Sequence, residues 1–202
     1  MIYIVDYGLG NLASIKNMFK HIGIKDVIIT SDKNELAKAD KIILPGVGAF
    51  DNGMLHLKEY DLLETLNRKA LIDKIPVLGI CLGMQLMTKG SEEGVEEGLG
   101  WFDAYTYKFD LNKEYKIPHM GWNYIKKVNN NIDIINPDKK YRFYFVHSYY
   151  VKCNNKNEVL FETEYGTKFH SGIIKDNLIG LQFHPEKSLH FGMDIFKWFA
   201  KF

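Results

Sequence analysis

The alternation of apolar and amphipathic segments constrains the fold of this chain most strongly. Apolar runs typical of buried strands occupy residues 2–7, 27–30, 41–46 and 76–80, and helical patterns are predicted for residues 12–22, 31–39 and 53–73. Strands that alternate with helices form right-handed βαβ units, and such units build a parallel sheet with helices on its faces. The first half of the chain therefore predicts an α/β fold.

The pattern changes after Gly100. Three β-rich segments follow with few helical intervals, at residues 141–151, 158–165 and 177–184. They predict antiparallel additions, so we expect an open mixed, mostly parallel sheet flanked by helices. A closing helix is predicted whose core-facing side carries Phe191, Ile195, Trp198, Phe199 and Phe202. With 202 residues and no repeat or linker, a single domain spanning residues 1–202 is expected.

Composition argues against several classes of protein. The 26 basic and 25 acidic residues give a net charge of +1, so neither nucleic acid nor a membrane surface is an expected partner. The apolar runs are far shorter than the roughly 18–20 residues that span a bilayer, and residues 1–8 lack the basic region of a signal peptide. Two cysteines do not make a disulfide framework, so a cytoplasmic setting is expected. No metal-ligand spacing occurs, and we expect no metal and no cofactor.

Cys81 lies at a predicted strand–turn–helix corner, with Gly79 two residues before it and Gly83 two residues after it. This pattern resembles the nucleophile elbow G-x-S-x-G with sulfur in place of oxygen. The N-terminus of the following helix favours a thiolate, and the backbone N–H of Leu82 is a candidate oxyanion donor. The competing interpretation is a small apolar core residue, since free cysteines are usually buried.

His184 is the candidate base for this thiol. It ends an apolar strand, and Pro185 then breaks the strand, so its side chain is expected at the carboxyl edge of the sheet. Glu186, two residues on, can hydrogen-bond the imidazole and orient it. Alone, this segment is more typical of a plain strand end and turn, and only its pairing with Cys81 favours the catalytic hypothesis.

The loop after the third predicted strand, residues 44–50, reads LPGVGAF. Gly46 and Gly48 allow the backbone to approach a ligand and to turn its N–H groups toward it. By itself the segment is compatible with a plain loop. Beside a nucleophile elbow it predicts a second oxyanion donor.

These motifs occur in an order that resembles the class I (triad) glutamine amidotransferases. The resemblance rests on GICLGMQ at 79–85, QFHPEKS at 182–188 and PGVGAF at 45–50. Further segments are similar to the glutaminase subunits of imidazole glycerol phosphate synthases: DYGLGNL at 6–12, SEEG at 91–94, GLGW at 98–101, IPHMGWN at 117–123 and YFVHSYY at 144–150. The resemblance covers essentially the whole chain. Leu9 departs from it, because many relatives have Pro or Ser there.

The resemblance implies a flavodoxin-like fold, L-glutamine as substrate and a heterodimer with a (β/α)8-barrel cyclase that receives ammonia. The implied catalytic residues are Cys81, His184 and Glu186. The implied oxyanion donors are the backbones of Val47, Gly48 and Leu82, and the implied substrate-binding residues are Gln85, Ser148 and Tyr149. The implied partner interface contains Asn11, Trp122, Tyr144 and Lys187.

Three alternatives stay open at this point. Residues 8–13, GLGNLA, satisfy G-x-G-x-x-A after a strand, and Asp32 follows the second strand, which is the outline of a dinucleotide-binding redox protein. A second alternative is a binding subunit without catalytic activity, although Cys81, His184 and Glu186 are all present. The third is a paralogous glutaminase that supplies ammonia to an amidating synthase of bacterial surface-sugar biosynthesis.

Overall fold

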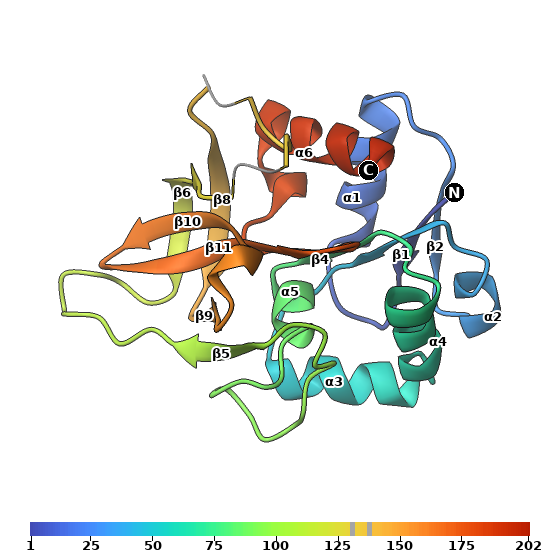
Figure 1. The fold of residues 1–202 in the computed structure, drawn as a ribbon, viewed down its shortest axis with the longest axis horizontal. Helices are drawn as coiled ribbons and strands as arrows, with labels where there is room; N and C mark the ends of the chain where they lie inside the picture. The colour runs from blue at the N-terminus through green and yellow to red at the C-terminus, as the bar shows by residue number, and fades with distance from the viewer. Residues whose placement is uncertain (130–131, 137–138) are drawn as a thin grey trace.

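The parallel half of the sheet follows the predicted alternation. The computed structural model describes residues 1–129, 132–136 and 139–202. The parallel strands are β1 (Ile2–Val5), β2 (Val27–Thr30), β3 (Lys41–Leu44), β4 (Val77–Ile80) and β12 (Leu178–Leu181). They lie in the order β2-β1-β3-β4-β12 (Figure 1). Strands β4 and β12 are therefore neighbours although they are about half the chain apart.

Helices cover both faces of this parallel half. They are α1 (Leu12–His21), α2 (Lys33–Leu36), α3 (Phe50–Glu59), α4 (Leu63–Asn67), α5 (Leu82–Leu86) and α6 (Leu189–Lys201), with a π-helical turn at Arg68–Ile72. In Figure 1, α1 and α6 lie on one side of the sheet, and α3, α4 and α5 lie on the other. Among the residues that the structure describes, no helix is long and apolar enough to cross a membrane.

The single helix predicted over residues 53–73 is wrong in its bounds. The helical segment begins earlier, at Phe50, and breaks after Glu59. Asp61 has a φ of 54°, a left-handed conformation that interrupts the helix, and Leu62 is fully buried beyond it. The chain then resumes as α4 and the π-helical turn. No glycine or proline marks this break in the sequence.

The second half of the chain extends the sheet with antiparallel strands. Strands β11 (Thr167–Lys175), β10 (Val159–Tyr165) and β7 (Lys126–Lys127) follow β12 in order, and β9 (Tyr149–Cys153) pairs with both β11 and β5 (Ala104–Lys108). Strands β6 (His119–Tyr124) and β8 (Arg142–His147) form a separate antiparallel pair. Short 3-10 turns occupy Lys156–Glu158 and Pro185–Lys187. The mixed sheet is confirmed, but the antiparallel prediction is wrong for β12, which is parallel to β4. Strands β5, β6, β7 and β11 were not predicted.

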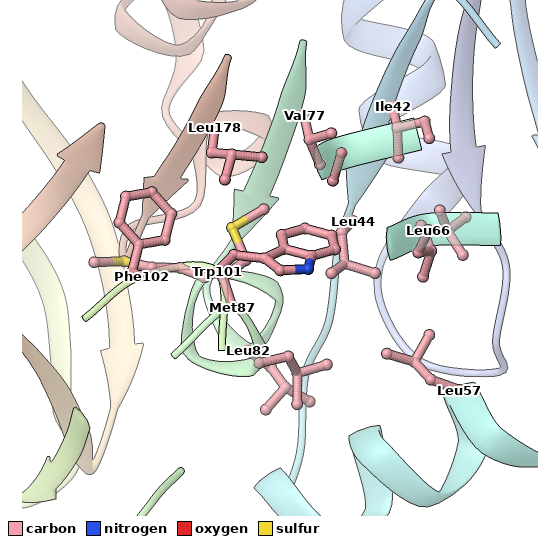
Figure 2. Packing of buried hydrophobic residues seen from close by; sticks show 14 of the residues in the cluster. Ile42, Leu44, Leu57, Leu66, Val77, Leu82, Met87, Trp101, Phe102 and Leu178 are labelled. Atoms are coloured by element: carbon pink, nitrogen blue, oxygen red, sulfur yellow. The ribbon is translucent and has the colours of Figure 1, made fainter. Parts of the chain in front are cut away.

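The alternating side chains of the strands divide the core into two layers. Residues such as Leu44 and Val77 pack with α3, α4 and α5, and Figure 2 shows this cluster together with Trp101 and Phe102. The opposite layer packs against α1 and α6. The stripe predicted on α6 is partly wrong: Phe196 is fully buried, whereas Phe202 is 40% exposed. The two layers hold the carboxyl ends of β4 and β12 rigidly side by side.

Candidate active site

Cys81 stands at the turn between β4 and α5, as the sequence predicts. Its φ of 53° and ψ of −108° are unusual for a residue with a side chain. A Cβ at Gly83 would collide with the carbonyl oxygen of Leu44, and one at Gly79 would lie 2.8 Å from the Gly83 backbone. Both glycines are therefore required by the close approach of α5 to β3 and β4.

His184 and Glu186 form a buried pair beyond the end of β12. His184 Nδ1 lies 2.7 Å from Glu186 Oε1, and the two side chains are 1% and 2% exposed. The backbone N–H of His184 donates to the Tyr144 carbonyl at 2.9 Å, and the Ser188 hydroxyl donates to the His184 carbonyl at 2.6 Å. The imidazole is thus fixed on its Nδ1 side, and Nε2 is buried with no hydrogen-bond partner.

The charge state of His184 follows from these neighbours. Burial lowers the pKa of the imidazole, but the Cys81 thiolate and then Glu186 raise it, so the pKa reaches about 10. Since Nε2 makes no hydrogen bond, we attribute the effect of Cys81 to its nearby charge. A thiolate beside an imidazolium can attack a carbonyl carbon, and the imidazolium can then supply a proton to the leaving amine.

A cavity of about 450 Å³ opens over the thiol. Its lining residues are Val47, Gly48, Ala49, Cys81, Leu82, Gln85, Glu93, Pro118, Val146, His147, Ser148 and Tyr149. The structure therefore brings the predicted nucleophile, oxyanion residues and substrate-binding residues to one cavity. Its volume falls within the range of small-ligand sites. In the loop at its rim, Val47 is 40% exposed and Gly48 has a φ of 109°.

Two amide side chains connect the thiol to the far wall of the cavity. Gln85 Nε2 donates to the Tyr149 carbonyl at 3.2 Å and to Gln182 Oε1 at 3.1 Å. Gln182 Nε2 in turn donates to Cys81 Sγ at 3.7 Å. Both N–H groups of Gln85 are used in this way, which leaves its carbonyl oxygen as the acceptor for a ligand.

Gln182 and Glu93 are functional-site residues that were not predicted from the sequence. Gln182 is fully buried in an otherwise apolar segment, and this polar interruption is the signal that could have identified it. Glu93 adds a carboxylate to the cavity wall, and its Oε2 accepts a hydrogen bond from the Phe50 N–H at 2.9 Å. Its segment, residues 91–94, was singled out for resemblance but given no role.

Three of the four residues expected at a partner interface, Trp122, Tyr144 and Lys187, lie together beside the site, with Trp122 and Lys187 exposed and Tyr144 half-buried. The Trp122 and Tyr144 rings make an edge contact with centroids 6.4 Å apart, and Lys187 Nζ lies 5.8 Å from the Tyr144 ring centre. Trp122 is 42% exposed. Asn11 is also exposed, and it caps α1 by accepting a hydrogen bond from the Ser14 N–H. Tyr144 belongs to both regions, because its carbonyl holds the His184 backbone.

The residues of the dinucleotide alternative have structural partners. The Asp32 carboxylate, expected to bind a ribose, caps α2 by accepting a hydrogen bond from the Asn34 N–H at 2.7 Å. A Cβ at Gly10 would lie 3.2 Å from Pro45, so this glycine permits close packing against the loop that begins at Pro45. Gly10 thus packs against the loop that contributes Val47 and Gly48 to the cavity wall.

Comparison with known proteins identifies the family. The model of the glutamine amidotransferase class-I family matches residues 3–201. The chain belongs to the class I glutamine amidotransferases. This membership accounts for the cysteine corner, the histidine–glutamate pair and the glycine loop in one molecule.

Two relatives of this amidotransferase illustrate its place in the family. It is 54% identical to the imidazole glycerol phosphate synthase subunit HisH 2 of Methanococcus maripaludis, over 100% of this chain and 99% of the relative. It is 43% identical to the subunit of the same name from Pseudomonas aeruginosa, with the same coverage. The family assignment therefore extends to the HisH subunits.

Solved structures show that other amidotransferases share the fold. One described as a crystal structure of glutamine amidotransferase has a TM-score of 0.77 and 17% identity, covering 100% of this chain and 98% of that chain. The structure of PurLQS from Thermotoga maritima has a TM-score of 0.76 and 18% identity, covering 99% of this chain and 97% of that chain. At these identities the likeness concerns the fold alone.

Proposed function

We propose that this chain is the glutaminase subunit of an imidazole glycerol phosphate synthase. It hydrolyses L-glutamine to glutamate and ammonia, and the ammonia passes to a (β/α)8-barrel cyclase in histidine biosynthesis. The observation that carries the proposal is the meeting of Cys81 with the His184–Glu186 pair beside one cavity, in a chain 54% identical to a HisH subunit. We further propose that residues 1–202 act as a single domain. The two free cysteines support a reducing, cytoplasmic setting.

The reaction begins with attack of the Cys81 thiolate on the side-chain amide carbon of glutamine. The oxyanion that forms is held by the N–H of Leu82 and by the backbone at Val47–Gly48. His184 donates its proton to the amide nitrogen, so the C–N bond breaks and ammonia leaves. The neutral imidazole then takes a proton from water, the resulting hydroxide attacks the thioester, and glutamate and the thiolate are released.

The cavity supplies groups for both charged ends of glutamine. The free carbonyl oxygen of Gln85 and the carboxylate of Glu93 suit the α-ammonium group. Backbone N–H groups at Ser148–Tyr149 suit the α-carboxylate. This arrangement favours free glutamine over a glutamine residue within a protein. In a protein the α-amino and α-carboxyl groups are in peptide bonds and carry no charge for these groups to bind.

Glutamate release by the purified chain, alone and with its cyclase, tests the proposed function. We expect glutamine-dependent formation of imidazole glycerol phosphate by the complex, with one glutamate released per product. Asparagine serves as the control substrate, because its shorter side chain does not reach Cys81 when its charged ends are bound. Absence of glutamate release from the complex would refute the proposal.

A second candidate function is retained because of how the relatives are named. Both relatives described above carry the number 2, which distinguishes them from another subunit of the same name. The paralogue hypothesis therefore stays a proposal: ammonia would pass to an amidating synthase of surface-sugar biosynthesis. Rescue of a histidine auxotroph that lacks its glutaminase subunit separates the two functions. Growth without histidine supports the first, and restored surface sugar without such growth supports the second.

Replacement of Glu186 by glutamine is expected to lower kcat by about 10- to 100-fold. The amide can still hydrogen-bond Nδ1, but it removes a negative charge that raises the pKa of His184. Steady-state hydrolysis of glutamine measures the loss. A decrease as large as that of the Cys81→Ala variant would assign Glu186 a direct chemical role.

Replacement of Trp122 and Lys187 together by alanine is expected to weaken the complex with the cyclase about 30-fold, because exposed aromatic and cationic side chains dominate such interfaces. Titration calorimetry measures the dissociation constant. Tyr105→Ala combined with Lys152→Ala is the matched control, since this aromatic–lysine pair is exposed on β5 and β9. Equal affinities of both double variants would place the interface elsewhere.

A further inference from the structure

Two buried histidines, His147 in the wall of the glutamine cavity and His119 behind it, have no part in the proposed chemistry. His119 and His147 face each other across β6 and β8, with His119 Nδ1 at 3.0 Å from His147 Nε2. His147 Nδ1 lies 2.7 Å from the Tyr149 carbonyl oxygen, and Asn123 Nδ2 lies 3.3 Å from His119 Nε2. The four residues form one continuous chain of hydrogen bonds from strand β6 to the cavity wall.

The direction of every bond in this chain is determined by its ends. The Tyr149 carbonyl can only accept, so His147 carries its proton on Nδ1 and accepts at Nε2. His119 must then donate from Nδ1 and accept at Nε2. The Asn123 amide is fixed in turn, because its oxygen accepts from the Tyr124 N–H at 2.8 Å and its nitrogen donates to the Glu164 carbonyl at 3.0 Å.

Burial keeps both rings uncharged. Desolvation lowers the pKa of His147 to about 3 and that of His119 to about 4. The His119 ring stacks on Tyr165 with centroids 4.0 Å apart, and Phe169 packs against both histidines. Aromatic neighbours thus hold the two rings in place, and no proton is gained near neutral pH.

The Tyr149 carbonyl is where this chain reaches the site. It accepts from His147 on one side and from Gln85 on the other, at 2.7 and 3.2 Å. Gln85 continues to Gln182 and Cys81. If His147 carried its proton on Nε2 instead, the lone pair of Nδ1 would face the carbonyl oxygen and repel it. The donor on His119 prevents this tautomer.

We propose that His119 and His147 are positioning residues for glutamine binding. They form a directional relay that begins at Asn123 and holds the Tyr149 peptide and the Gln85 amide in the geometry the substrate requires. This inference rests on the proposed glutaminase function. It also connects the cavity to β6, the strand that carries Trp122.

Nitrogen-15 NMR of the histidine side chains tests the relay without any variant or activity. We expect His119 and His147 both to be neutral, with the proton on Nδ1, at pH 7. A proton on Nε2 of His147, or a charged ring, would overturn the inference. This result stands apart from the proposed function, because it holds whether or not the complex hydrolyses glutamine.

Two amide variants of His147 test the positioning role in the complex with the cyclase. In His147→Asn the amide nitrogen replaces Nδ1 and can still donate to Tyr149, whereas in His147→Gln the amide lies near the Nε2 position and the donor is lost. We expect the KM for glutamine to rise about tenfold in His147→Gln with kcat changed less than about threefold, and His147→Asn to stay within about threefold of the native KM. Equal KM values for the two variants would refute the positioning role.

Removal of the outer donor tests whether the relay is directional. In His119→Phe the ring stacking is kept, but His147 Nε2 has no donor. We expect the NMR spectrum to show His147 in both tautomers and the KM to rise as in His147→Gln. A single Nδ1–H tautomer and a native KM in this variant would show that His119 only fills space.

Discussion

Replacement of Cys81 by alanine is expected to abolish glutamine-dependent synthesis and to leave ammonia-dependent synthesis intact. Removal of the nucleophile from a triad of this kind lowers kcat by about 10⁴-fold or more, since no other group in the cavity can form the thioester. The assay follows product formation by the complex with glutamine and then with an ammonium salt. The second substrate bypasses Cys81 and reports directly on the cyclase.

The ammonium reaction is also the control for this variant. A normal rate with ammonium shows that the complex has assembled and that the loss concerns glutamine alone. Cys153→Ala is the matched cysteine variant: this second thiol is buried, burial raises its pKa to about 12, and we expect near-native activity without it. Glutamine turnover near the native rate in Cys81→Ala would refute the nucleophile assignment.

Replacement of His184 by asparagine is expected to lower kcat for glutamine hydrolysis by about 10³- to 10⁴-fold. In the proposed mechanism the imidazolium is the proton source for the leaving ammonia and the neutral imidazole is the base for thioester hydrolysis, so both halves of the reaction are affected. Steady-state kinetics measures the overall loss, and mass spectrometry of the quenched enzyme measures any trapped thioester.

His21→Asn is the control for this substitution. His21 is exposed on α1, where its Nδ1 lies 3.0 Å from the Asn17 carbonyl, and we expect no change in glutamine hydrolysis. A loss in His184→Asn that is smaller than the loss in Glu186→Gln would reverse the roles assigned to the pair.

The parallel half of the fold could be predicted because its signals are local. Strand β2 matches its prediction at both ends, and α1 begins at Leu12 as predicted and ends at His21, one residue before its predicted end. The break at Asp61 was missed because a left-handed aspartate leaves no mark in composition or periodicity. The direction of β12 was missed for another reason: it depends on pairing with β4, about 100 residues earlier, which no local pattern reveals.

The residues of the site also differ in whether a local sequence signal or a long-range contact identifies them. Cys81, His184 and Glu186 each follow a strand and carry a recognisable local motif, and the structure brings them together; their catalytic roles stay predictions. Gln182 and His147 lie in segments that carry the resemblance, but no local pattern assigns either of them a role. Their significance comes from contacts with β4, α5 and β6, so only the folded chain reveals that Gln182 reaches Cys81 and that His147 reaches Tyr149.

The strained backbone at Cys81 lowers the stability of the fold, and therefore the amount of folded protein in the cell, while it presents a reactive thiol. A residue with a side chain at φ 53° and ψ −108° carries strain of about 1–3 kcal/mol, which glycine would relieve. Because steady-state levels of a protein depend on differences of this size, selection for abundance alone favours glycine at position 81. Under the proposed function, the demand for ammonia retains the sulfur there. In a lineage whose synthase takes ammonia from another source, Cys81 is therefore expected to be among the first residues of the site to be substituted. Its replacement by glycine would leave a more stable subunit that still binds the synthase.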